Sequence, residues 1–157
     1  MATPPDAWET QLLQLINASR SEAGVAPLAF DSELQSAADQ HTHWMLSTDT
    51  FSHTGSGGSS PFQRMAAAGY DYRSAGENIA YISGWGAETI DSADVERLHA
   101  NLMASPGHKA NLLNPNFTEV GLGLEQGDYG GWPALFLTED FGGPSASEAA
   151  EPDNWLI

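Results

Sequence analysis

Two histidines and one glutamate occur in sequence contexts that favour a functional role. His53 occurs in FSHTG, after the apolar end of an expected helix and before the polar run GSGGSS. His108 occurs in SPGHKANLL, and Glu77 directly precedes the apolar run NIAYI. A neutral imidazole binds metal ions, whereas a carboxylate beside a buried strand must be paired, hydrogen-bonded or placed on a cation. A metal site is one interpretation. The alternatives are a loop histidine without function and a carboxylate that anchors backbone amides.

The position of His108 favours an uncharged ring. If Ser105 is the N-cap of a helix and Pro106 its first residue, His108 falls in the first turn. The helix dipole disfavours an imidazolium at that end, so the ring tends to stay neutral. A neutral ring can donate its lone pair to a metal ion.

The remaining histidines and the serines give weaker signals. His41 and His43 are two residues apart on an expected helix, so they point to different faces and cannot chelate together. We expect His41 to be packed, His43 to be exposed, and His99 to be structural or on the surface. There is no HExxH motif and no GxSxG motif in a strand–turn–helix context, which disfavours a zinc protease helix and a serine hydrolase.

Length and charge limit the classes of protein to which this chain can belong. A chain of 157 residues with 41% hydrophobic residues is long enough for one domain with a core. Its 21 acidic residues against five Lys and Arg give a net charge of −16, which repels nucleic acid and anionic membranes. With no cysteine there are no disulfides, and no apolar run is long enough to span a membrane. We expect a saline or extracellular setting. The opening MATPPDAWE lacks the layout of a signal peptide and looks like a chain that begins after a removed leader.

The apolar spacing predicts helices that alternate with a few strands. The expected helices run from Trp8 to Ala23, from the N-cap Asp31 onward, from Ser60-Pro61 to a stop at Gly69, from Ser92 to Met103, and, as a turn or helix, from Ser105-Pro106 through HKANLL. The expected strands are 78–82, 120–124 and 134–138. This order predicts an α+β fold in which helices pack on one sheet.

The last residues differ in composition from the rest. Residues 143–157 are acidic and rich in Gly, Pro, Ala and Ser, which is typical of a linker or tail after a domain at 1–142. They end on Trp155, Leu156 and Ile157, which either dock back on the domain or mark where another domain begins.

Four stretches together resemble the CAP superfamily of cysteine-rich secretory, antigen 5 and pathogenesis-related 1 proteins. They are LINASRSEAGVAPLAFDSEL, FSHTG, GENIA and SPGHKANLLNPNFTEVGLG, and the likeness runs from about residue 8 to 142 and is nearest to the bacterial, cysteine-free, SCP-like branch. The resemblance implies a three-layer α-β-α sandwich with a central antiparallel sheet, secretion, and an open cleft with two histidines and two acids. By position, His53 and His108 match the histidines and Glu77 matches the first acid.

The second acid of that cleft departs from the family pattern. Ser105 stands where eukaryotic members carry the glutamate, and Leu102 stands where they carry a tryptophan. Glu96, on a neighbouring turn, is a candidate to take the place of that acid. Glu139, in TEDFG, replaces the glutamine frequent in relatives and is expected at the cleft rim.

These residues lead to two functional hypotheses. In the first, His53 and His108 hold a divalent metal ion, zinc first with copper, magnesium or calcium as alternatives, in a secreted module that binds a small molecule, lipid, sterol or glycan. In this hypothesis, Glu77 and Ser105 lie next to the two metal-binding histidines. In the second, the same cleft is a metal-assisted hydrolase such as a peptidase, with Glu77 catalytic. Whether the protein is an enzyme stays open. In both cases it can be one domain of a longer extracellular protein, without a nucleic-acid partner.

Overall fold

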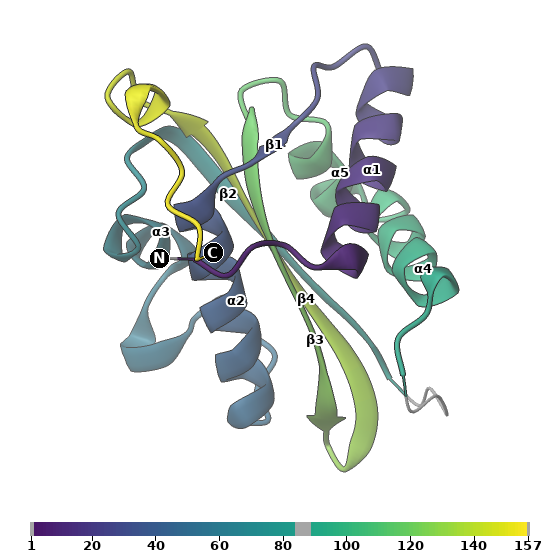
Figure 1. The fold of residues 1–157 in the computed structure, drawn as a ribbon. Coiled ribbons are helices and arrows are strands. Elements are labelled where there is room, and N and C mark those ends of the chain that lie inside the picture. Colours follow the sequence, from purple (N-terminus) through teal and green to yellow (C-terminus); the bar gives the residue numbers. More distant parts are fainter. Residues whose placement is uncertain (1, 84–88, 157) are drawn as a thin grey trace.

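A four-stranded sheet lies between two layers of helices in the computed structural model, which describes residues 2–83 and 89–156 (Figure 1). The strands are β1 (Ala29–Phe30), β2 (Tyr72–Ser83), β3 (Glu119–Tyr129) and β4 (Trp132–Pro144). Their order in the sheet is β1-β3-β4-β2, so β2 is an edge strand. β4 pairs antiparallel with both β2 and β3, whereas the short β1 pairs parallel with β3. The α+β, three-layer prediction is confirmed, with one parallel pair added at an edge.

The helices each begin within one residue of the start that the sequence predicts. They are α1 (Ala7–Glu22), α2 (Ser32–Ser47), α3 (Pro61–Ala67), α4 (Ser92–Met103) and α5 (Pro106–Leu112), with short 3-10 turns η1 (Ser56–Gly58) and η2 (Glu148–Ala150). Asp6, Ser60 and Asp91 each form a reciprocal capping box with the residue three positions on, and the Asp31 side chain caps α2. Such caps satisfy backbone amides that have no partner inside the helix.

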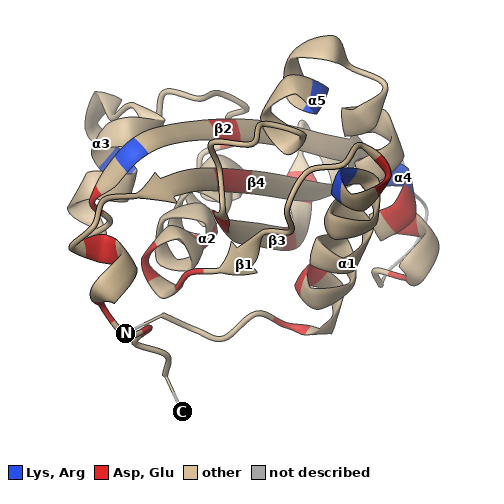
Figure 2. Cartoon of the chain, turned by 90° about the horizontal axis from the view of Figure 1, so that it is seen from above, with Lys and Arg blue, Asp and Glu red and all other residues tan. Residues whose placement is uncertain are grey.

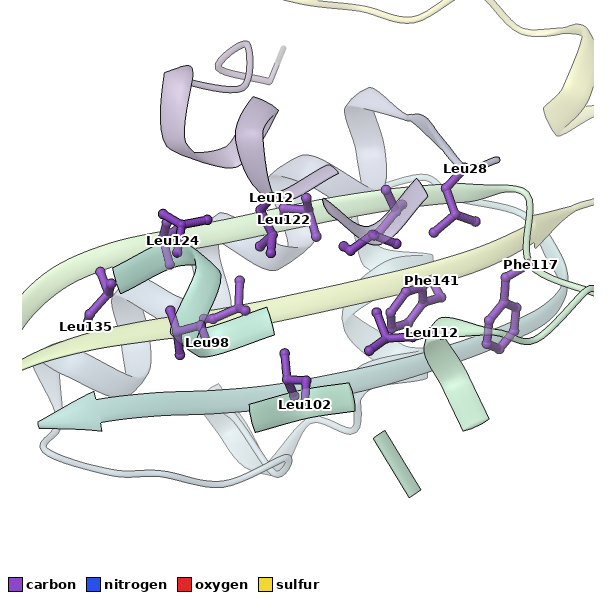
Figure 3. Close-up of a cluster of buried hydrophobic side chains, with 14 of the residues drawn as sticks. Leu12, Leu28, Leu98, Leu102, Leu112, Phe117, Leu122, Leu124, Leu135 and Phe141 are labelled. Atoms are coloured by element: carbon purple, nitrogen blue, oxygen red, sulfur yellow. The ribbon is translucent and has the colours of Figure 1, made fainter. Parts of the chain in front are cut away.

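Each face of the sheet has its own helices and its own part of the core. α1, α4 and α5 cover one face, where leucines of these helices pack with Leu122 and Leu135 of the sheet (Figure 3). α2 and α3 cover the other face, where Leu34, Met45 and Met65 are fully buried. Burial of such side chains contributes roughly 1.5–3 kcal/mol each. The two layers therefore bring loops from both faces to the outer edge of β2.

The strands are longer than the apolar runs predicted. β2 begins at Tyr72 instead of Asn78, and β4 extends from Trp132 to Pro144. Pairing with β4 along 72–83 provides the backbone hydrogen bonds that polar residues and glycines in this stretch require. Periodicity marks only the buried part of a strand, so Glu77 lies inside β2 and not in front of it.

The described part of the C-terminal segment lies against the domain, while Ile157 is outside the described residues. Ala2 and Trp155 form a parallel bridge, so the two ends of the chain meet (Figure 1). The Asp153 carboxylate accepts from the amide of Ser32 at 2.8 Å, and the buried Glu148 accepts from the amide of Asp71 at 2.8 Å. Trp155 therefore docks on the domain, which is one of the two alternatives that the sequence left open for these residues. The division at residue 142 stays a prediction.

Acidic residues occur in both helical layers and on the sheet, and basic residues are few (Figure 2). Among the described residues, no helix combines the length and the apolar character that crossing a membrane requires. Two of the five basic residues are largely buried. Arg20 is 1% exposed, and the Arg64 side chain is 10% exposed.

Candidate functional site

A cavity of about 570 Å³ at the edge of β2 brings His53 and His108 together. His53 reaches it from the loop after α2, and His108 from the first turn of α5. Ile79 and Tyr81 of β2 and Leu102 of α4 also line this cavity. The tertiary structure thus places both predicted histidines on one solvent-open cavity, one from each helical layer.

Glu77 holds the ring of His53 in place. Its Oε1 accepts a hydrogen bond from His53 Nδ1 at 2.8 Å, and its Oε2 pairs with Arg64 Nη2 at 2.7 Å. Because a carboxylate only accepts, Nδ1 of His53 carries a proton, and in the neutral ring Nε2 keeps the lone pair. The Glu77 side chain is 1% exposed and that of His53 is 52% exposed. The buried carboxylate of Glu77 therefore holds the imidazole of His53, while about half of the His53 side chain is exposed to solvent.

Arg64 is a residue that sequence reasoning missed. It lies on α3, and besides pairing with Glu77 it donates from Nη1 to the backbone carbonyl of His53 at 2.9 Å and to that of Ser59 at 3.0 Å. One guanidinium therefore positions the carboxylate and the loop that carries the imidazole. A signal existed in the sequence, since basic residues are so rare in this chain that an arginine on a mostly apolar short helix is unusual.

Asp140 lies opposite Glu77 in the register of β2 and β4. It is fully buried, and among the described residues no N–H or O–H group of a standard donor reaches either of its oxygens. Burial and the neighbouring Glu77 charge raise the pKa of Asp140 well above its ordinary value, which favours the protonated form of Asp140, a form that can donate to Glu77. Burial alone would raise the pKa of Glu77 as well, but hydrogen bonds with His53 and Asp140 and the charge of Arg64 lower it. Glu77 is the charged member of this pair.

Asn78, the next residue along β2, holds the backbone of the second histidine, His108. Its side-chain amide donates to the backbone carbonyl of His108 at 3.1 Å and to Glu139 Oε1 at 3.0 Å, and its Oδ1 accepts from Asn111 at 2.9 Å. These bonds tie the first turn of α5 to the strand. Neighbouring strand residues point to opposite faces of a sheet, so Glu77 and Asn78 support the two histidines from different sides.

The ring of His108 is suited to the neutral form. Burial lowers its pKa, and the nearby ring of His53 lowers it further. The uncharged state expected from the helix position therefore has a second cause, the partial burial of the ring beside another imidazole.

Three sequence expectations for the surroundings of the site require correction. Ser105 is the N-cap residue of α5, but its side chain makes no capping hydrogen bond and instead lines the cavity. Glu96 is exposed on α4 and does not line the cavity. Glu139 lies beneath the site and not at its rim: it is fully buried because its strand is central in the sheet.

The other histidines behave as predicted. His41 is buried at 1% exposure, whereas the side chain of His43 is 71% exposed and contacts Glu125. His99 is buried, and its Nε2 lies 2.8 Å from Ser19 Oγ, which ties α4 to α1. None of the three lines the cavity between His53 and His108.

A separate acidic cluster has the spacing of possible metal ligands. In the described part of the chain, Asp31, Glu33 and Glu148 place carboxylate oxygens within 4.8 Å of one another. This cluster joins the start of α2 to the C-terminal segment. Burial raises the pKa of Asp31 to about 6, and burial together with the contact to Glu148 raises the pKa of Glu33 to about 7, so protons can relieve the repulsion there.

A family model decides the identity of the fold. The model for the cysteine-rich secretory protein family, CAP, matches residues 13–141. This chain belongs to the CAP family. The absence of cysteine and the bacterial relatives confirm the expected SCP-like branch.

The CAP domain is similar to proteins of known sequence and structure. It is 36% identical over 132 residues to the uncharacterized protein YkwD of Bacillus subtilis, covering 83% of this chain and 47% of YkwD. An extracellular SCP-domain protein of Bacillus anthracis matches with a TM-score of 0.66 and 27% identity over 90% of this chain and 45% of that chain. NaASP2, whose crystal structure was determined with Zn²⁺, matches in fold alone, with a TM-score of 0.61 and 15% identity over 92% of this chain and 83% of that chain. The CAP domain thus spans about half the length of the first two.

Proposed function

We propose that this CAP domain is a secreted binding module that holds a divalent metal ion, zinc first, between His53 and His108. The observation that carries the proposal is the 2.8 Å hydrogen bond from His53 Nδ1 to Glu77. Histidines that bind metal ions almost always donate their other ring N–H to a carboxylate, a carbonyl or water, which fixes the tautomer and the direction of the ring. The ion pair with Arg64 holds that carboxylate in turn.

The donor set suits zinc or copper better than magnesium or calcium. Imidazole nitrogen is a preferred ligand of the first two, whereas magnesium and calcium prefer oxygen. Two protein nitrogens leave coordination positions open for water or a ligand, so we expect modest affinity. When bound, the ion would act as a Lewis acid that attracts oxygen atoms of a ligand. The zinc in NaASP2 makes zinc the first ion to test.

The state of Glu77 favours binding over hydrolysis. Both of its oxygens are engaged, one by His53 and one by Arg64, and its pKa is lowered. A general base needs a free lone pair and a pKa near the working pH. Ser105 lines the cavity, but no hydrogen bond joins its hydroxyl to a histidine within residues 2–83 and 89–156. The hydrolase remains the second hypothesis, and these contacts do not support it.

The rest of the cavity suits a ligand with an apolar part. Its lining includes the apolar and aromatic side chains of Phe51, Ile79, Tyr81 and Leu102, and its polar lining residues are Ser52, His53, Thr54, Asn101, Ser105 and His108. Tyr81 is 38% exposed, which leaves an aromatic surface open to solvent. A small molecule, lipid, sterol or glycan that presents an oxygen to the metal ion fits this arrangement.

Secretion is supported by charge and by likeness. The Bacillus anthracis neighbour is an extracellular protein, and a net charge of −16 keeps a protein soluble in saline surroundings. Because the chain spans about half of YkwD, we expect it to act as one domain of a longer protein.

Calorimetric titration of zinc tests the proposal. We expect binding to weaken by at least about tenfold in His53→Ala and in His108→Ala, since each removes a ligand. His43→Ala is the matched control, because that side chain is 71% exposed and lies outside the cavity. Unchanged binding in both cleft variants would reject the site. Turnover of peptide or ester libraries that disappears with chelator would favour the hydrolase instead.

A further inference from the structure

A second cavity, of about 480 Å³, lies between α2, the loop with η1, and α3. It shares no lining residue with the cleft of His53 and His108. The loop after α2 contributes to both: residues 52–54 line the cleft, and Ser56 and Ser59 line the second cavity. Its size lies within the range of small-molecule sites, roughly 300–1,000 Å³.

An aromatic pair forms part of its wall. The rings of His41 and Trp44, both lining residues, stack with their centroids 5.7 Å apart and an interplanar angle of 13°. His41 donates from Nε2 to the carbonyl of Ser52 at 2.8 Å, and its Nδ1 is buried without a partner among the described residues. Burial lowers the pKa of His41, so the pair is neutral.

The polar groups on this wall can both donate and accept. Gln40 uses its Nε2 to donate to Ser36 at 2.9 Å, which leaves its Oε1 as an acceptor. Gln63 uses its Oε1 to accept from the amide of Ser60 at 2.9 Å, which leaves the two N–H groups of Nε2 as donors. Both glutamines are exposed. A ligand in the cavity therefore meets one amide that accepts and another that donates.

The charge of the surroundings selects a neutral ligand. Arg64 lines the cavity, but its charge is already paired with Glu77. The net charge of −16 repels anions. No carboxylate lines the cavity, so a cation has no partner there either.

We propose that this second cavity binds a neutral saccharide, with a ring against Trp44 and hydroxyls bonded to Gln40 and Gln63. The C–H groups of a sugar ring carry partial positive charge and pack on the negative face of an aromatic ring. Sugar hydroxyls donate and accept at once, which matches the pair of glutamine amides. The wall is already formed, because Ser59 O accepts from Arg64 at 3.0 Å and from the amide of Gly55 at 2.9 Å. Little ordering therefore opposes binding.

The test uses the whole chain, treated with chelator so that no metal ion contributes. Saturation-transfer NMR and calorimetry are run with cellobiose, maltose and N,N′-diacetylchitobiose at millimolar concentration. We expect at least one to bind, and Trp44→Ala to abolish that binding while Trp132→Ala, at a 65% exposed tryptophan on the β3–β4 hairpin, leaves it unchanged.

A second variant guards against misfolding. Gln63→Glu keeps the oxygen that caps α3, removes the two donors and adds one negative charge, so it should fold normally and weaken binding by about five- to tenfold. Gln14→Glu, exposed on α1, makes the same charge change elsewhere and should have no effect. The proposal is overturned if no saccharide binds, if Gln63→Glu binds as well as wild type, or if His53→Ala abolishes binding. Zinc titration stays independent of each result.

Discussion

Glu77 and Asp140 face each other across β2 and β4, and the pKa is lowered for Glu77 and raised for Asp140. Like charges this close cannot both ionise in a buried place, so the arginine and histidine on one side decide which of the two keeps the charge. The charged oxygen pair of Glu77 then orients His53 through Nδ1. The cleft histidine is thus held by a buried network and not by its own loop alone.

Removal of the Glu77 charge should weaken both stability and metal binding. Glu77→Gln leaves the Arg64 charge buried without its partner, so the free energy of unfolding should fall by roughly 3–5 kcal/mol. Zinc affinity should fall by about 10–100-fold, because the ring of His53 loses its anchor. Urea unfolding and calorimetry measure the two effects.

Glu125→Gln is the matched control for that variant. Glu125 also pairs with a histidine, His43, at 3.1 Å, but the two side chains are 41% and 71% exposed. Loss of the Glu125 charge should lower the free energy of unfolding by less than about 1 kcal/mol and leave zinc binding unchanged. Equal effects of the two variants would contradict the anchoring role of Glu77.

Glu139 should make the protein less stable as the pH rises. Burial raises the pKa of Glu139 to about 7 from an ordinary value of 4.5. Between these two values the folded chain binds a proton that the unfolded chain has lost, so its contribution to stability decreases with pH and levels off above pH 7. Glu139→Gln keeps the acceptor for Asn78 and should raise stability at pH 8 by roughly 2–3 kcal/mol, with little change at pH 4.5. Chemical unfolding at both pH values checks this, and parallel curves for variant and wild type would refute it.

Other buried carboxyl groups act in the same direction. Burial raises the pKa of Glu9 to about 8 and that of Asp39 to about 6. We therefore expect the wild-type protein to have a higher melting temperature at pH 5 than at pH 8. A melting temperature that increases over this range would show that opposing groups dominate.

Close packing of α2 on β3 should make Gly121 intolerant of a side chain. A Cβ at Gly121 would lie 2.1 Å from the backbone carbonyl of Leu34, and backbone cannot move aside cheaply. Gly121→Ala should therefore destabilise the fold by roughly 3 kcal/mol or more in thermal or chemical unfolding. Gly107→Ala is the control, because nothing lies within 4 Å of its Cβ position, and it should be neutral.

Replacement of Arg20 by lysine should lower the stability of the fold. Its guanidinium donates to the carbonyls of Ala26, Leu112 and Phe117 at 2.7–2.9 Å, and so it ties α1 to the end of α5. Lysine carries the same charge but cannot donate in three directions from a planar fork. Arg20→Lys should lower the free energy of unfolding by roughly 2–4 kcal/mol.

Arg97→Lys serves as the control for Arg20→Lys, because Arg97 is exposed on α4 and the change should be silent. If lysine at position 20 unfolds at the same urea concentration as wild type, the carbonyl bonds contribute nothing to stability.

The sequence by itself determined the helices, because their start signals are local. Caps such as Asp31 and Ser60 act on the backbone a few residues away, so their effect is local and can be read directly. The motifs around His53, Glu77 and His108 resemble those of the CAP superfamily, and that resemblance implied that the two histidines share one cleft. The start of β2 was missed because its pairing partner, β4, lies some 60 residues further along the chain.

Only the tertiary structure decided what supports that cleft. The spacing of residues along a chain shows which face of its own helix or strand a side chain occupies, but not which residue faces it from another element. Arg64 reaches Glu77 because α3 packs beside β2, and Asp140 meets Glu77 because of the strand register. The charge state of each carboxyl follows from that arrangement, since burial and neighbouring charges set the pKa.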